Sequence, residues 1–294
     1  MTLAWLSSQI VTAAVVCVML LSGTLLDPAV FLKQFNPASM KEFANLAFAS
    51  YILIPAIVIA LLWLAPLDPM VKLVVITLAM LPCAPVIPAM AALCDEPAEW
   101  ALFVLIAMSM LNLAALPVLL IVLRLPWLAG EAASIDGEQM LGILKFLGIT
   151  YVPMVCGLAL RYIVPQYLPQ IVGFLRRTMG KFLIASFVFY MAAHYRDLLE
   201  LGLREFVALL GMEAVCVSVA LLFVRSPANH RVTAMLSCTM RNFAMAIAFT
   251  TSVFAKTTAP VTMLAFTTIL FWLVTVSLGV YRRSTSARRA ANSA

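Results

Sequence analysis

Charged residues are scarce in this sequence. Only 11% of the 294 residues are Asp, Glu, Lys or Arg, whereas 64% are hydrophobic. A water-soluble globule of this size needs far more polar surface than that composition provides. The composition therefore excludes a soluble globular protein and predicts an integral membrane protein that is embedded in a lipid bilayer.

The sequence also lacks the residue patterns of most enzymes and metal sites. It has two histidines, and its six cysteines form no C-x-x-C pair and have no histidine at ligand spacing. No G-x-S-x-G motif, deep histidine or pair of aspartates supplies a nucleophile and a base. We therefore expect no enzymatic activity, no disulfide framework, no metal site and no cofactor. The cysteines are expected to be small packing residues.

Long apolar runs fill nearly the whole chain, and they do not alternate with polar residues as the strands of a β-barrel do. A helix needs about 20 apolar residues to cross a hydrocarbon core of about 30 Å. We therefore predict an all-α, polytopic membrane protein with a single transmembrane domain of nine helices. The nine segments are 8–26, 43–64, 70–93, 98–123, 139–160, 177–195, 204–224, 232–255 and 259–281.

Basic residues divide unevenly between the two sides that alternate loops define. The richer side contains Lys33, Lys41, Arg161, Arg176, Arg177, Lys181, Arg225, Arg231, Arg282, Arg283, Arg288 and Arg289, and the other contains Lys72, Arg124, Lys145, Arg196, Arg204 and Lys256. Since cytoplasmic loops carry the excess of Lys and Arg, we expect the richer side in the cytoplasm. The N-terminus then lies outside the cell membrane and the basic tail 282–294 inside. The net charge of +6 reflects this loop bias rather than nucleic-acid binding.

The segment 70–93 contains three residues that interrupt a helix. Pro82, Pro85 and Pro88 each remove a backbone donor and clash with the preceding turn. In hydrocarbon, the carbonyl groups left free are tolerated only where the backbone is buried in protein or lines a wet cavity. We therefore expect a break between Leu81 and Pro88, next to a cavity near the bilayer centre.

The segment 232–255 carries an arginine, Arg241, about 14 Å from its inner end. An arginine at the bilayer centre costs about 2.5–3.5 kcal/mol, so it normally has a partner or a polar cavity. Glu213 lies at a similar depth in 204–224 and is one candidate partner, in an ion pair that only fixes two helices. A substrate anion is the other candidate. For Asn242, which follows at a second expected break within 237–242, a role in satisfying the backbone and a ligand role are equally open.

The two interrupted segments occupy equivalent places if the last four helices repeat the first four. The first repeat then covers about 8–123 and the second lies within about 139–281, with 139–160 as an extra helix. Both interrupted segments precede a very short connection, DEPAE or KTTA. Because the two repeats start on opposite sides, they are inverted. Inverted repeats with matching broken helices are typical of secondary transporters with a site at the bilayer midplane.

Three stretches resemble motifs of a known family. VMLLSGTLLDPAVF in the first helix, SYILIPAI in the second and CTMRNFAMAIAF in the eighth are similar, in order and spacing, to motifs of the bile acid:sodium symporter family, whose superfamily also contains arsenite exporters. The resemblance implies a ten-helix inverted-repeat fold, or nine helices when the first is absent. It also implies a panel domain, a core domain and two unwound helices that cross in the core.

The chain departs from this family at the positions that hold sodium. Ser50 and Arg241 stand where the family has amide side chains, Ser237 stands where it has a glutamate, and LPCAPVIPAM lacks its asparagine. A guanidinium offers five donors and no acceptor, whereas sodium needs several oxygen ligands. We therefore expect transport that does not depend on sodium.

These observations together predict a secondary active transporter of a small organic anion, which works by alternating access. The alternatives are an anion channel and a sodium-independent exporter of an oxyanion such as arsenite. Asn112 and Ser109, in 98–123, are expected either to bind substrate or to form interhelical hydrogen bonds. The residues expected at the substrate site are Arg241, Asn242, Thr239, Ser237, Asn112, Ser109, Pro82, Pro85 and Ser50, and Glu213 is the expected coupling residue.

Overall fold

The computed structural model describes residues 3–25, 28–84, 87–94, 96–123, 137–193, 202–227, 229–254, 257–267 and 269–270. Within these residues the chain is helical, as predicted. Three helices are long and apolar enough to cross a membrane on their own: Pro37–Leu64, Glu99–Leu123 and Leu203–Phe223. The protein is therefore a helical membrane protein. The number of nine spans stays a prediction.

The helices follow the predicted apolar segments. In chain order they are α1 (Leu3–Leu25), α2 (Pro28–Lys33), α3 (Pro37–Phe48), the π-helical turn η1 (Ala49–Leu53), α4 (Ile54–Leu64), α5 (Pro69–Met80), α6 (Ile87–Leu93), α7 (Ala98–Leu123), α9 (Gly137–Ile163), the 3₁₀ turn η3 (Pro165–Tyr167), α10 (Leu168–Ala193), α12 (Leu203–Phe223), α13 (Arg231–Thr239) and α14 (Phe243–Val253). Residues 259–267 are also helical, whereas 271–281 of the last predicted helix and the basic tail 282–294 lie outside the described residues.

One predicted helix start is wrong. The segment 177–195 was expected to begin at residue 177, but α10 already begins at Leu168. The 3₁₀ turn η3 leads directly into α10, and Pro165 occupies the first position of η3, where a missing N–H leaves no hydrogen bond unmade. The helix therefore starts nine residues earlier than expected.

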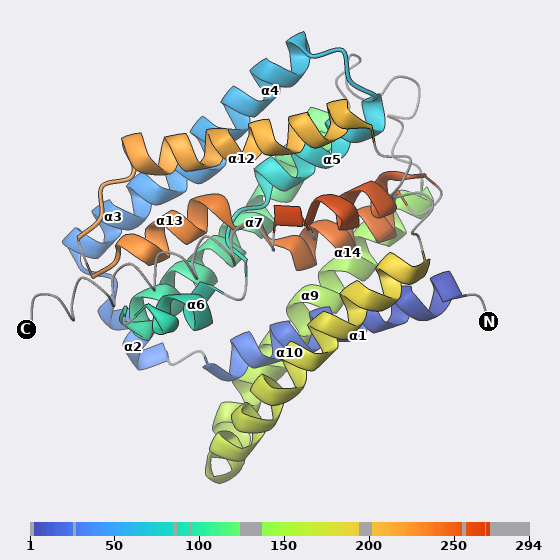
Figure 1. Ribbon diagram of the computed structural model, residues 1–294. Coiled ribbons are helices and arrows are strands. Elements are labelled where there is room, and N and C mark those ends of the chain that lie inside the picture. Colours follow the sequence, from blue (N-terminus) through green and yellow to red (C-terminus); the bar gives the residue numbers. More distant parts are fainter. Residues whose placement is uncertain are drawn as a thin grey trace, which may run out of the picture.

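The helices form two groups (Figure 1). In one group, α1 packs along α9 and α10. Gly23 of α1 and Gly157 of α9 lie where the two backbones touch, because a Cβ atom at either position would overlap a main-chain carbonyl of the other helix. Small residues of this kind let membrane helices approach closely.

The other group is built around α5. Every residue from Val71 to Met80 is buried, so this helix is covered on all sides. α3, η1 and α4 form one continuous rod beside α12, and α6 and α7 pack on each other next to α13. The two groups meet mainly where α14 packs against α9.

The start of α13 is fixed by a carboxylate from another part of the chain. The N-cap residue, His230, makes no side-chain capping bond. Instead, the buried carboxylate of Glu96 accepts hydrogen bonds from the backbone N–H groups of Val232 and Thr233 and from the Thr233 hydroxyl. An acidic group at a helix N-terminus satisfies free donors and complements the helix dipole. The short connection between α6 and α7 thereby holds α13 in place.

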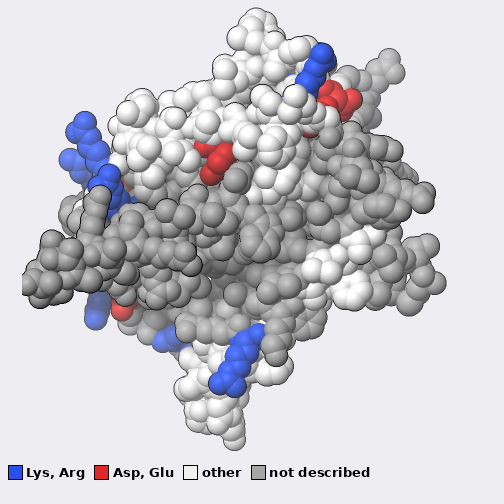
Figure 2. Space-filling view, viewed as in Figure 1, with Lys and Arg blue, Asp and Glu red and all other residues white. Residues whose placement is uncertain are grey.

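Most charged side chains lie toward the ends of the described surface, and one acidic patch lies between them (Figure 2). In Figure 2, Lys and Arg gather where α12 leads into α13, at the left of the view, and at the lower end of the molecule. The face over α12 and α4 between the ends is mostly uncharged. Exposed large apolar side chains on these two helices include Leu61, Trp63, Val207 and Leu222. Such an apolar surface suits contact with lipid.

Candidate functional site

Both predicted breaks are present, and they meet. The helical segment 70–93 is interrupted between Met80 and Ile87, and 232–255 is interrupted between Thr239 and Phe243. The N–H of Asn242 donates to the carbonyl of Leu81 over 2.8 Å, and the N–H of Ala84 donates to the carbonyl of Met240 over 3.2 Å. We call residues 81–84 and 240–242 the crossing. Its backbone groups satisfy one another, as interrupted helices in a membrane require.

The first break follows from proline chemistry. Pro82 has no N–H to continue α5, and Pro88 fits the first turn of α6, where no donor is needed. Cys83 between them has a φ of 68°, in the left-handed region that a non-glycine residue rarely adopts. Strained backbone of this kind is concentrated at functional sites. Pro85, another predicted site residue, lies outside the described residues.

The second break contains no proline and no glycine. Its cause is Asn242, whose side-chain oxygen accepts a hydrogen bond from the N–H of Met245 over 3.1 Å and so caps α14. Asparagine is among the best N-cap residues, because its side chain replaces a lost backbone acceptor. The backbone role expected for Asn242 is therefore present. Its side-chain nitrogen Nδ2 is buried and has no hydrogen-bond partner among the described residues.

Arg241 is completely buried at the crossing. Its Nη1 donates to the carbonyl of Ala79 over 3.3 Å, and its Nη2 donates to the sulfur of Cys216 over 2.8 Å. Its Nε has no hydrogen-bond partner among the described residues. The guanidinium is always charged in proteins, so this site holds a positive charge in the protein interior.

Glu213 does not neutralise that charge directly. No ion pair joins it to Arg241 in the described part of the chain, and its oxygen Oε2 is buried without a hydrogen-bond partner there. Glu213 lies one helical turn before Cys216 on α12, on the same face as the sulfur that contacts the guanidinium. The carboxylate is therefore close to the arginine but not bonded to it.

Asn112 joins the crossing from α7. Its Nδ2 donates to the carbonyl of Pro82 over 3.2 Å and also lies 3.6 Å from the sulfur of Met245. Its Oδ1 accepts from the hydroxyl of Tyr51, at 2.8 Å. Asn112 thus ties α7 and the η1 turn to the unwound backbone of the first break.

The four predicted site residues that carry a hydroxyl group differ in their hydrogen-bond partners. Ser50, which is fully buried in η1, lies 3.5 Å from the sulfur of Cys238 on α13. The hydroxyls of Ser109, Ser237 and Thr239 each donate to a carbonyl one turn earlier in their own helices. Such bonds satisfy a hydroxyl within its own helix. The structure therefore brings Arg241, Asn242, Asn112, Pro82 and Ser50 together, and Ser237 lies beside Cys83 of the crossing. Ser109 and Thr239 are engaged only within their own helices among the described residues.

Sequence reasoning missed four residues of this site. Cys83, Cys216 and Cys238 are buried, and two of them contact Ser50 or Arg241. They were expected to be packing residues. Cys83 and Cys238 lie within the predicted breaks, and this position could have identified them as site residues. No feature of the sequence distinguishes Cys216 or Tyr51.

The fold and the site define a helical membrane protein in which two interrupted helices meet around a buried arginine. No family model matches the chain, and no curated protein sequence matches it either.

Proposed function

We propose that this chain is a secondary active transporter of a small organic anion, with Arg241 as the group that binds the anion. The observation that carries the proposal is a pair of buried donors on consecutive residues, Arg241 Nε and Asn242 Nδ2, that have no acceptor among the described residues. A buried donor left without an acceptor costs about 1–3 kcal/mol, and more when it is charged. An anion at the crossing satisfies both donors.

The local chemistry favours a carboxylate or another planar oxyanion. A guanidinium binds such groups through two parallel hydrogen bonds. The N-terminus of α14, capped by Asn242, adds partial positive charge at the same place. Asn112 and Ser50 carry no formal charge. Among the described residues of the predicted substrate site, Arg241 alone supplies the positive charge that would bind an anion.

Alternating access supplies a route to this buried site. The group of α1, α9 and α10 and the group built around α5 would move against each other as panel and core domains, which opens the crossing to one side of the membrane and then to the other. The limited contact between the groups, mainly α14 on α9, supports this division. Nine spans in two inverted repeats belong to the same proposal, supported by the breaks in the third and eighth segments.

Glu213 is proposed as the coupling residue. An acidic side chain within the membrane is by default a candidate proton carrier. Its position one turn from Cys216 places it near the charge that the substrate would neutralise. Proton binding to Glu213 and anion binding to Arg241 would then influence each other electrostatically.

A sodium-independent exporter of arsenite is the second candidate. The observation that favours it is the set of three buried cysteines near the crossing, Cys83, Cys216 and Cys238. Thiols are soft ligands that suit a soft centre such as trivalent arsenic. Arsenite would be recognised by sulfur, and its transport would survive neutralisation of Arg241, whereas transport of an organic anion would not.

The test is uptake into proteoliposomes. Metabolite profiling of a deletion strain first identifies candidate anions, which are then labelled. Their uptake is compared between the wild type, Arg241→Gln and the control Arg177→Gln. Arg177 is an exposed arginine on α10, outside the crossing. We expect Arg241→Gln to lower uptake at least about 100-fold, as loss of a buried charge pair of about 3 kcal/mol or more implies, and Arg177→Gln to leave it unchanged.

Folding must be checked separately, by the elution profile and melting temperature of each variant. If Arg241 only fixes α13 to α12, Arg241→Gln will be unstable and the double variant Arg241→Gln, Glu213→Gln will recover stability. Uptake by well-folded Arg241→Gln at the wild-type rate contradicts the proposal.

A further inference from the structure

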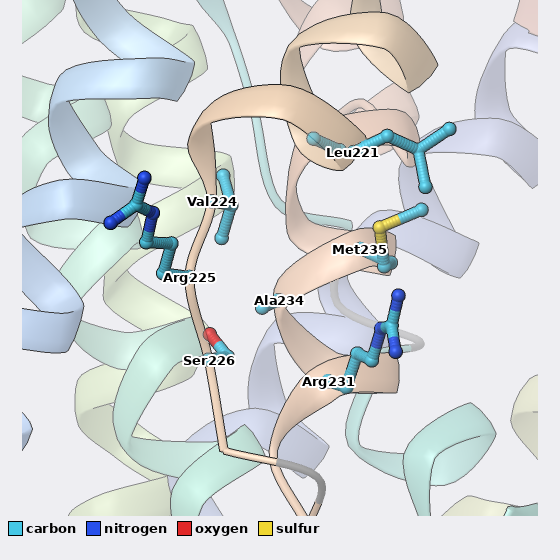
Figure 3. Close-up of a pocket in the computed structure, with 8 residues that line it drawn as sticks. Leu221, Val224, Arg225, Ser226, Arg231, Ala234 and Met235 are labelled. Atoms are coloured by element: carbon cyan, nitrogen blue, oxygen red, sulfur yellow. The ribbon is translucent and has the colours of Figure 1, made fainter.

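A cavity of about 320 Å³ lies away from the crossing, where α12 ends and α13 begins. Its lining includes Leu221 and Val224 from the α12 side, Arg225 and Ser226 from the connection, and Arg231 and Met235 from α13. Figure 3 shows Arg225 and Arg231 on opposite sides of this region, with Leu221 and Met235 above Arg231. The cavity is therefore bordered by a basic side chain on each of two sides and by apolar side chains above Arg231.

The two arginines carry charge that no acidic group in the described part of the chain balances. Arg225 and Arg231 are exposed, and no ion pair joins either to an acidic group within the described part of the chain. None of the described residues that line the cavity is acidic. Two carboxylates lie at the start of α13: Glu96 accepts from the N–H groups of Val232 and Thr233, and Glu42 contacts His230.

A hydroxyl group adds a neutral donor. The Oγ atom of Ser226 is buried and has no hydrogen-bond partner among the described residues. A buried hydroxyl normally has one. Two guanidinium groups and one hydroxyl are the donors that a phosphate group uses most, because it offers several acceptor oxygens and negative charge.

The apolar side of the cavity, next to Leu221, continues into exposed apolar surface at the end of α12. Leu221, Leu222 and Phe223 are exposed to 58%, 73% and 51% at the end of α12. α12 is itself one of the helices long and apolar enough to cross a membrane. A ligand that combines a phosphate, beside the arginines, with hydrocarbon, beside Leu221 and Met235, therefore suits this cavity.

We infer that this cavity binds an anionic phospholipid, with the phosphate beside Ser226 and the exposed side chains of Arg225 and Arg231 turned toward it, and with an acyl chain along the apolar end of α12. Both arginines belong to the side that the charge distribution assigns to the cytoplasm, where anionic lipids are concentrated. The site is separate from the anion site proposed at Arg241. It connects the bilayer to α13, whose other end forms the crossing.

The experiment measures lipid binding to the purified full chain by native mass spectrometry, with phosphatidylglycerol as the probe and phosphatidylcholine as the neutral lipid. The variants are Arg225→Gln with Arg231→Gln, the single variant Ser226→Ala, and the control Arg177→Gln. An arginine near a membrane surface contributes about a fivefold gain in affinity for anionic lipid, so we expect the double variant to bind phosphatidylglycerol about thirtyfold more weakly. Ser226→Ala should weaken binding less, and Arg177→Gln should not change it.

A second arm separates the lipid from free phosphate. Inorganic phosphate and glycerol phosphate compete with phosphatidylglycerol for the wild-type protein in a neutral detergent. We expect neither to displace the lipid at equal concentration, because they lack the acyl chain. Full displacement by either soluble ion, equal binding of phosphatidylcholine, or unchanged phosphatidylglycerol binding by the folded double variant overturns the inference. Monodisperse elution of that variant shows that it is folded.

Discussion

The α1–α9 contact and the crossing both bring main chain against main chain, but by opposite means. At Gly23 and Gly157 the backbones approach because there are no side chains between them, and both helices stay intact. At the crossing the helices are broken, and the freed N–H and carbonyl groups of the two breaks bond to each other. The first contact is apolar and suits a rigid scaffold. The second places peptide dipoles and a buried cation in the protein interior, so polarity is concentrated in one place.

The largest expected effect on stability is at the glycine contact. Gly157→Ala places a Cβ atom against the carbonyl of Leu20, a main-chain atom that cannot move without shifting α1. We expect a loss of about 3 kcal/mol in the free energy of unfolding, the upper part of the range for overpacking. Unfolding by SDS titration in mixed micelles measures it.

Gly148 provides the matched control on the same helix. A Cβ atom there meets no described heavy atom within 4 Å. Gly148→Ala should therefore raise stability by about 0.5–1 kcal/mol, because alanine favours the helix. If both substitutions have the same effect, the close α1–α9 approach is wrong.

A smaller loss is expected where a side chain supports the crossing. Asn112→Leu removes the donor to the Pro82 carbonyl and leaves that acceptor and the Tyr51 hydroxyl with one partner fewer. We expect a loss of about 2 kcal/mol, within the range for an unsatisfied buried group. Unfolding by SDS titration in mixed micelles measures this loss as well.

Ser109→Ala is the control, because within the described residues the Ser109 hydroxyl bonds only to Leu105 in its own helix. It should change stability by less than about 0.5 kcal/mol. An equal loss in both variants means that the two residues of α7 have the same role, contrary to the contacts described above.

The crossing, unlike the α1–α9 contact, should open during transport. Cys216 is buried against Arg241, whereas Cys156 on α9 is exposed. A bound organic anion at ten times its Kd should slow alkylation of Cys216 by a small maleimide about tenfold, because it occupies the protein in that proportion. Peptide mass spectrometry reads each cysteine separately.

Alkylation of Cys156 should not respond to the anion, and that of Cys216 should not respond in Arg241→Gln. Protection of Cys216 that is equally strong in this variant places the anion elsewhere.

The smallest expected effect concerns sodium. The crossing holds a fixed guanidinium and no carboxylate among its described residues, so a cation there is repelled by Arg241 and finds no carboxylate ligand within the crossing itself. Uptake into proteoliposomes should therefore change less than about twofold when an inward sodium gradient is imposed at constant pH. Strong, saturable stimulation that disappears with the gradient shows instead that carbonyl and hydroxyl oxygens hold the ion.

The helices and the two breaks could be predicted from the sequence, because each depends on local features. Long apolar runs fix the helices, and prolines mark the break after Met80. Which residues face the crossing could not be predicted. In a soluble protein the polar face of a helix shows its orientation, but in lipid both faces are apolar and this signal is lost. Cys216 and Tyr51 were therefore missed, and Ser109 and Thr239 were included although they bond within their own helices.

The hydrogen bonds that join Leu81 to Asn242 and Met240 to Ala84 use only main-chain atoms. Replacement of a side chain by any residue other than proline leaves the donors and acceptors of these bonds in place. These bonds are thus independent of the side chains, whereas the helix breaks that expose their donors and acceptors depend on Pro82 and Asn242. In a transporter of the kind proposed above, the other side chains around the joint could be exchanged, and the solute with them, while the main-chain joint is kept.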